Sequence, residues 1–154
     1  MDHNFQIELL HKKASEGDFT SRFNFEYLSF TSHLSNNLYL ESVSIEESIQ
    51  KLKNDKVLRE EYVALISYHR LLKKVWNSLI KESQQNLIDQ KNAIQNLEDW
   101  ENMVEFWYHT RKKLHNGKKV FRNNDNQSVV EEAYYTLSFF MENQIKKLSK
   151  FKTG

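Results

Sequence analysis

Residues 99–117 read DWENMVEFWYHTRKKLHNG, and this stretch organises the rest of the chain. Apolar side chains recur in it and just before it at spacings of three and four residues, which places them on one face of a helix. They are Leu97, Trp100, Val104, Trp107, Tyr108 and Leu114. Glycine accepts the left-handed conformation that closes many helices, so Gly117 is the predicted end. The stretch therefore predicts an amphipathic helix that buries this face.

Helix-breaking residues are nearly absent from the whole chain. Proline does not occur, and glycine occurs at positions 17, 117 and 154. Lysine, glutamate, leucine, asparagine and glutamine are abundant, and most of these residues are good helix formers. We therefore expect an all-α fold, and the 154 residues fit one domain that spans 1–154.

The composition excludes several classes of protein. Charged residues make up 28% and aromatic residues 13%, which is typical of a globular chain, and the net charge of +1 gives no global signal for a polyanionic partner. The absence of cysteine excludes disulfides and thiolate metal sites. The N-terminus has no signal-peptide pattern, and no apolar run approaches the roughly 18 residues that cross a bilayer. We expect a soluble cytoplasmic protein with no membrane partner.

Further helical patterns flank the central one. Besides the central helix, we expect main helices over about residues 21–41, 56–83 and 128–150. Two short helices are expected, one over about residues 2–15 and one through Ile49 and Leu52. Capping residues are expected to begin them: Ser44 with Glu47, Asp55, Asn96, and Ser128 with Glu131. Four main helices and one or two short ones predict an up-and-down helical bundle.

Basic residues gather around the end of the central helix, and no acidic residue lies between Glu105 and Asp125. They are Arg111, Lys112, Lys113, Lys118, Lys119 and Arg122. Such a zone can hold the phosphates of a nucleic acid. The alternative is that lysines after a helix C-terminus oppose the helix dipole and remain solvated.

Arg111 and His115 share the apolar face of the central helix, four residues apart. Arginine can hold a phosphate without losing its charge, and histidine can move a proton near neutral pH. Together they suffice for RNA cleavage without a metal or cofactor, since arginine stabilises the phosphoryl charge while histidine serves the 2′-hydroxyl or the 5′ oxygen. The alternative is a helix-terminal capping arrangement without catalysis.

The stretch DWENMVEFWYHTRKKLHNGKK at 99–119, followed by RNNDNQSVVEEAYYTLSFF at 122–140, resembles the C-terminal half of HEPN domains, in particular the ApeA-like HEPN group. In that half a helix ends in an arginine, a polar residue or two, a leucine, His-Gly and a lysine. A short loop with an aspartate follows, and the next helix opens with an apolar pair and an alanine. The matching residues are Arg111, Leu114, Gly117, Lys119, Asp125, Val129, Val130 and Ala133.

The resemblance implies a bundle of four or five helices that usually forms a homodimer. In the family two copies build one composite, metal-independent ribonuclease site, and members act as toxins, antiphage defence effectors or RNA-processing modules. RNA and a protein antitoxin or regulator are the implied partners. Arg111 carries over as the motif arginine.

The sequence departs from the family pattern at the expected histidine. With Gly117 aligned, Asn116 occupies that place and His115 stands one residue early. Lys112 replaces the usual polar residue after the arginine. Asparagine cannot act as a general acid or base, so either His115 replaces the family histidine or the chain is an inactive binding or regulatory module.

The other histidines favour structural roles. His69 lies on the apolar face of its predicted helix, and His109 points about 200° away from Arg111 on a helical wheel. His3, His11 and His33 have no partners at metal-ligand spacing, and no glycine-rich phosphate loop occurs. Two hypotheses remain: a dimeric HEPN-type endoribonuclease, and a non-catalytic helical module that binds a protein or RNA.

Overall fold

The computed structural model describes residues 3–36, 44–68, 73–74, 76–78, 98–116 and 124–152. All regular secondary structure in these residues is α-helical, which confirms the predicted all-α fold. The helices are α1 (His3–Lys13), α2 (Phe19–Asn36), α3 (Ile45–Lys53), α4 (Lys56–Tyr68), α6 (Trp100–Asn116) and α7 (Asn124–Lys152).

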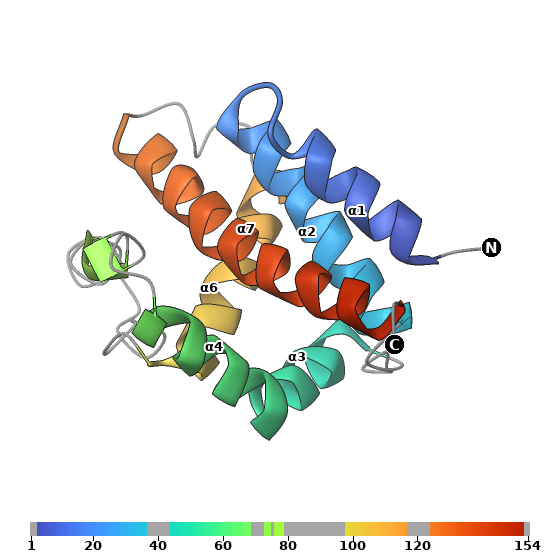
Figure 1. Cartoon of the computed structure of the whole chain (residues 1–154). Helices are drawn as coiled ribbons and strands as arrows, with labels where there is room; N and C mark the ends of the chain where they lie inside the picture. The colour runs from blue at the N-terminus through green and yellow to red at the C-terminus, as the bar shows by residue number, and fades with distance from the viewer. Residues whose placement is uncertain are drawn as a thin grey trace.

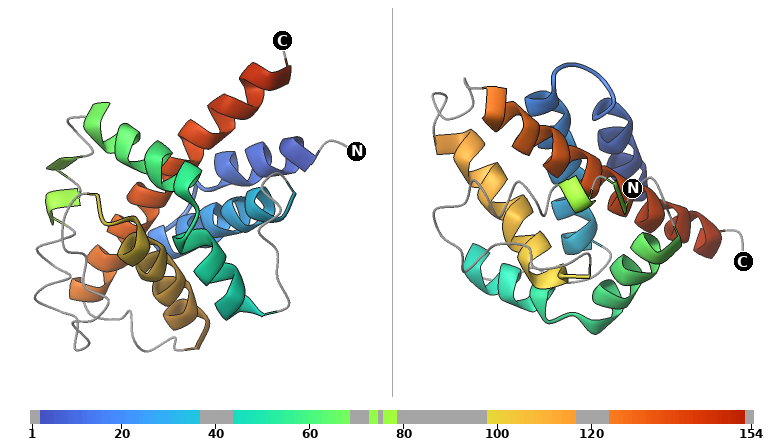
Figure 2. Two further views of the ribbon diagram at one scale, coloured as in Figure 1. Left: turned by 90° about the horizontal axis from the view of Figure 1, so that it is seen from below. Right: turned by 90° about the vertical axis from the view of Figure 1, so that its left-hand side faces the viewer.

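The helices form a bundle around α2 and α7. Gly17, with a φ of 88°, turns the chain between α1 and α2, which lie side by side in opposite directions (Figure 1). Helix α7 packs against α2, and α6 lies behind both in the view of Figure 1. Helices α3 and α4 lie at the bottom of the bundle in that view and contact α6. Figure 2 shows that the C-terminal end of α7 extends beyond the other helices.

Large aromatic side chains fill the core. Trp107 is fully buried, and its ring lies 5.6 Å from that of Phe30, 6.0 Å from Trp100 and 5.7 Å from Phe140. The indole of Trp107 also donates a hydrogen bond to Oγ1 of Thr136 on α7, at 2.9 Å. These contacts join α2, α6 and α7, so the central helix is held on several sides at once.

The predicted apolar face of α6 is the face that packs. Trp100, Val104 and Trp107 are buried, and Tyr108 and Leu114 are half-buried against the core. Leu97 and Gly117 lie outside the described residues.

Capping residues begin the short helices as predicted. The Oγ atom of Ser44 accepts the backbone N–H of Glu47 at 3.1 Å and begins α3, and Oδ1 of Asp55 accepts that of Leu58 at 3.0 Å and begins α4. Asn54 ends α3. Of the predicted helix over 56–83, the structure describes α4 and helical residues at 73–74 and 76–78; the remainder lies outside the described residues.

Two predicted helix starts are wrong. Helix α6 begins at Trp100, where Oδ1 of Asp99 accepts the N–H of Asn102 at 3.3 Å, so Asp99 takes the capping role given to Asn96. Helix α7 begins at Asn124, so Ser128 lies inside the helix and does not cap it. Asparagine and aspartate suit helix caps and first turns as well as loops, so the polar run that precedes Ser128 does not mark the boundary.

Candidate functional site

Arg111 lies where the C-terminal part of α6 packs against α2. Its Nη1 atom donates a hydrogen bond to Oδ1 of Asn24 at 2.6 Å. Its guanidinium carbon lies 5.9 Å from the centre of the Tyr27 ring. Asn24 and Tyr27 are one turn apart on α2, so a single helix supplies both the acceptor and the ring.

The position of Arg111 follows from the pattern of α6. Trp107 is buried one turn earlier, and Leu114 is half-buried one turn later. Arg111 therefore lies on the core side of the helix and is itself half-buried. Its aliphatic stem can cover apolar surface while the charged end reaches the edge of α2.

No carboxylate neutralises Arg111 in the described part of the chain: no ion pair joins its guanidinium to an acidic side chain there. Arg59 provides the contrast, since its Nη2 atom lies 2.6 Å from Oε1 of Glu101. A guanidinium has five N–H donors, and one hydrogen bond to Asn24 leaves most of them for an external acceptor. The arrangement can bind an anion.

The phenol of Tyr27 lies near Arg111. Burial raises the pKa of Tyr27, the nearby Tyr108 raises it further, and the charge of Arg111 opposes the rise. The hydroxyl of Tyr27 therefore stays protonated at neutral pH and can donate a hydrogen bond. The site thus combines one positive charge, the amide of Asn24 and the neutral phenol of Tyr27.

The structure places the remaining predicted site residues less completely. Lys112 and Lys113 follow Arg111 on α6 and are exposed. His115 and Asn116 belong to the last turn of α6, but their side chains are outside the described part of the structure. The predicted pairing of Arg111 with His115 therefore stays a prediction. Lys118, Lys119 and Arg122 lie outside the described residues altogether.

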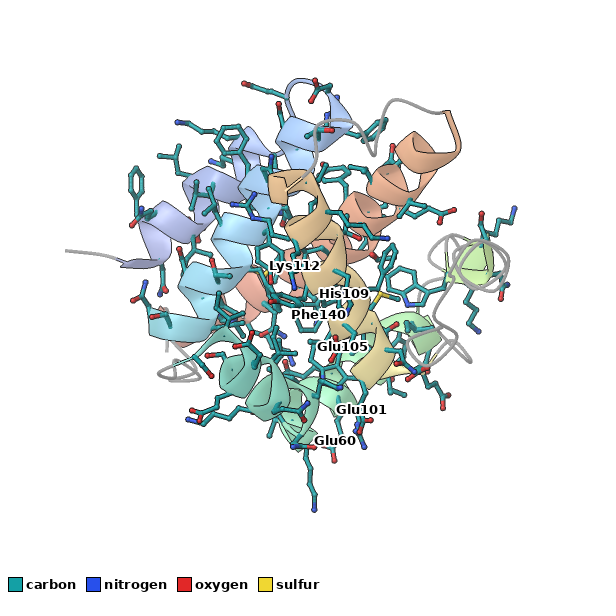
Figure 3. The ribbon with its side chains drawn as sticks, turned by 180° about the vertical axis from the view of Figure 1, so that it is seen from behind. Glu60, Glu101, Glu105, His109, Lys112 and Phe140 are labelled. Carbon is teal, nitrogen blue, oxygen red and sulfur yellow. The ribbon has the colours of Figure 1, made fainter. Side chains whose placement is uncertain are left out.

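His109 belongs to another side of α6, as its sequence position predicts. Its Nε2 atom lies 3.1 Å from Oε2 of Glu105, whose Oε1 atom accepts a hydrogen bond from Lys53 of α3 at 2.9 Å. Figure 3 shows Glu101, Glu105, His109 and Lys112 following one another along α6 on the side toward the viewer. Glu101, Glu105 and His109 of this row have charged partners, whereas Arg111 turns to α2.

Two polar contacts, one part-buried and one buried, involve histidines for which the sequence suggested no partner. Nδ1 of His11 donates to Oε1 of the fully buried Glu26 at 2.6 Å. Nε2 of His33 donates to Oε1 of Gln144 at 2.9 Å, and the amide of Gln144 donates to Glu61. The described residues contain no group of three or more His, Asp or Glu side chains that could hold a metal ion. His69 lies outside the described residues.

A groove of about 520 Å³ opens between α4 and α7, away from Arg111. It is lined by Val57, Ala64, Tyr68 and Lys147 among others, and Tyr68 is the most exposed of the large hydrophobic residues that the structure describes. Arg111, Lys112 and Lys113, the predicted site residues whose side chains the structure describes, do not line it. Among the Arg111 site, the histidine contacts and the groove, the Arg111 site is therefore the candidate functional site that the sequence indicated.

The site residues that the sequence did not indicate are Asn24 and Tyr27. The only signal for Asn24 is that a polar residue interrupts the aromatic run FNFEY at 23–27. A polar residue in such a run needs a partner when the helix is packed on several sides.

Comparison of the chain with models of protein families, with curated proteins and with solved structures finds no match. Among the described helices, none combines the length and the apolar character that a bilayer crossing requires.

Proposed function

We propose that this chain is a HEPN-like endoribonuclease that cleaves RNA without a metal ion, at a site shared by two copies of the chain. Arg111 holds the scissile phosphate, His115 moves the proton, and Asn116 positions the reacting groups. The chain acts as a toxin or antiphage defence effector that a protein antitoxin or regulator neutralises. The flanking phosphates are held by Lys112, Lys113, Lys118, Lys119 and Arg122.

The setting of Arg111 carries this proposal. A half-buried guanidinium that has an amide acceptor and no carboxylate among the described residues keeps its full charge for a ligand. Two exposed lysines follow it directly on α6. A positive site of this kind suits a phosphodiester better than it suits a neutral metabolite.

RNA cleavage of this kind needs a positive charge at the phosphate and groups that transfer protons at the 2′-hydroxyl and the 5′ oxygen. The ribose 2′-hydroxyl loses its proton to a histidine and attacks phosphorus, while the bond from phosphorus to the 5′ oxygen breaks and that oxygen gains a proton. The Arg111 guanidinium stabilises the charge that develops on the non-bridging oxygens. The products are a 2′,3′-cyclic phosphate and a free 5′-hydroxyl. In a shared site the second copy supplies the second proton-transfer group.

The experiment is cleavage of single-stranded RNA by the purified chain in EDTA. We expect cyclic phosphate ends, and a loss of about 100-fold or more for Arg111→Ala, the scale of removing one preorganised donor from a developing oxyanion. Arg59→Ala is one control, because Arg59 is paired with Glu101. Arg22→Ala is the closer control, since Nε of Arg22 donates to the carbonyl of Gly17 and its guanidinium lies over the Phe19 ring. Undiminished cleavage by Arg111→Ala contradicts the proposal.

A second candidate function is a non-catalytic HEPN-like module that binds RNA or a protein, and Asn116 specifically favours it. Asn116→His restores the family spacing after Arg111, and His115→Ala removes the histidine that stands one residue early. If the natural chain is active, His115→Ala lowers cleavage by about 100-fold, the size of a general acid–base contribution. If only Asn116→His cleaves RNA, the natural chain is the binding module. If neither the natural chain nor Asn116→His cleaves RNA, the nuclease proposal is wrong.

A further inference from the structure

Asn24 is the acceptor that orients Arg111, and its side chain is neutral. The hydrogen bond between Oδ1 of Asn24 and Nη1 of Arg111 is 2.6 Å long and half-buried, and it joins residues 87 positions apart in the chain. An arginine whose role is to fasten two helices is served better by a carboxylate, as Arg59 is served by Glu101. An amide fixes the direction of the guanidinium and leaves its charge unneutralised.

The Tyr27 ring restricts the position of the Arg111 guanidinium from a second direction. The guanidinium carbon lies 5.9 Å from the ring centre, within the range in which an aromatic face attracts a cation. Tyr27 is itself held between Phe23 and Phe30, at ring distances of 5.8 and 5.9 Å. The cradle for Arg111 is therefore built on a packed part of α2.

We propose that Asn24 is a positioning residue that, with the Tyr27 ring, points the charged Arg111 at a phosphodiester anion of single-stranded RNA without neutralising it. This inference rests on the proposed function and adds the residue that makes Arg111 available to the ligand. A carboxylate at position 24 would occupy the same place and compete directly with the phosphate for the guanidinium.

The decisive variant is Asn24→Asp, which keeps the shape of the side chain and adds the competing charge. The stability of the folded chain is expected to be unchanged or higher, because an ion pair replaces a hydrogen bond of the same geometry. RNA affinity is expected to fall by about 10- to 100-fold, the factor that corresponds to one charge-assisted hydrogen bond. If Asn24 had only a structural role, Asn24→Asp would not combine an unchanged or higher stability with a lower RNA affinity.

The measurement is fluorescence anisotropy with a labelled single-stranded RNA that carries 2′-O-methyl groups and therefore cannot be cleaved. Asn24→Asp and Arg111→Ala should weaken binding alike, and the double variant should lose no more than either one. Each should lower the slope of log affinity against log salt by about 0.7, the value for one phosphate contact on a single strand. Asn143→Asp, which adds the same charge beside the groove on α7, is the matched control and should bind within about twofold of the natural chain.

The outcomes separate this inference from the proposed function. If Arg111→Ala binds RNA as the natural chain does, both are wrong. If Arg111→Ala loses affinity while Asn24→Asp retains it, or if the two losses add in the double variant, only the role of Asn24 is overturned. A thermal melt of each variant shows whether a loss of binding comes from unfolding.

Discussion

The half-buried His11 and the fully buried Glu26 form a pair that joins α1 to α2. Burial disfavours the charged imidazole of His11, but the hydrogen bond and charge of Glu26, and the charge of Glu142 on α7, outweigh it and raise the pKa of His11 above 6.5. Burial also raises the pKa of Glu26 above 4.5, against the opposing effect of His11. Both groups therefore hold their protons to higher pH than they do in the unfolded chain.

A group whose pKa is raised by folding contributes stability below its unfolded pKa and loses that contribution as the pH rises through its folded pKa. We therefore expect the contribution of His11 to the free energy of unfolding to decline above pH 6.5. Glu26→Gln removes the charge that raises the pKa of His11, so the decline should disappear in that variant. Urea unfolding of the natural chain and of Glu26→Gln from about pH 6 to about pH 9 measures this decline in the free energy of unfolding. Parallel pH profiles would show that the pair does not act as inferred.

His33 is expected to show the opposite pH dependence. It is 2% exposed, and burial lowers its pKa below 6.5, against the opposing effects of Gln144 and Glu61. Its neutral form contributes stability that is complete above pH 6.5 and is lost as the pH falls through the lowered value. The natural chain should therefore lose stability relative to His33→Gln on acidification. The prediction fails if urea unfolding gives a difference that is constant or grows in favour of the natural chain.

At the scale of the helix, the sequence predicts type better than boundaries. The burial of Trp100, Val104 and Trp107 follows directly from their spacing, because a helix with one apolar stripe has one way to bury it. The start of α7 does not follow, because residues 124–127 are as acceptable in a first helical turn as in a loop. Side-chain pairs are harder still: Asn24 and Arg111 are 87 residues apart, and His33 and Gln144 are 111 apart.

The corrected start of α7 distinguishes two serines that look alike in the sequence. Ser44 caps α3 through the N–H of Glu47, so Ser44→Ala should lower the free energy of unfolding by about 1 kcal/mol. Ser128 lies inside α7, where alanine is the better helix former, so Ser128→Ala should be neutral or slightly stabilising. Urea denaturation of the two variants tests the pair. A comparable loss for Ser128→Ala would place the helix start at residue 128 after all.

For the molecule as a whole, the bundle and the Arg111 site differ in how far the sequence could reach. The bundle depends on composition and spacing, which many residues repeat, so an error at one cap leaves it intact. The site depends on whether a neutral or an acidic side chain accepts the hydrogen bond of Arg111. The packing of α2 against α6 determines which side chain this is. The sequence could propose Arg111 but could not identify Asn24 as its acceptor.

A site shared by two copies makes activity depend on concentration. If RNA is cleaved where Arg111 of one copy meets the second copy, the rate per chain should be constant above the dissociation constant of the dimer and fall in proportion to concentration well below it. A site complete within one chain gives a constant rate per chain throughout. Cleavage in EDTA over a dilution series, with sedimentation velocity on the same samples, compares the fall in rate with the loss of dimer. Ser128→Ala serves as a control that should dissociate and lose activity at the same concentration as the natural chain, since that position lies within a helix and outside the proposed site. A rate per chain that does not change while the dimer dissociates would confine the chemistry to a single copy and remove the need for a shared interface.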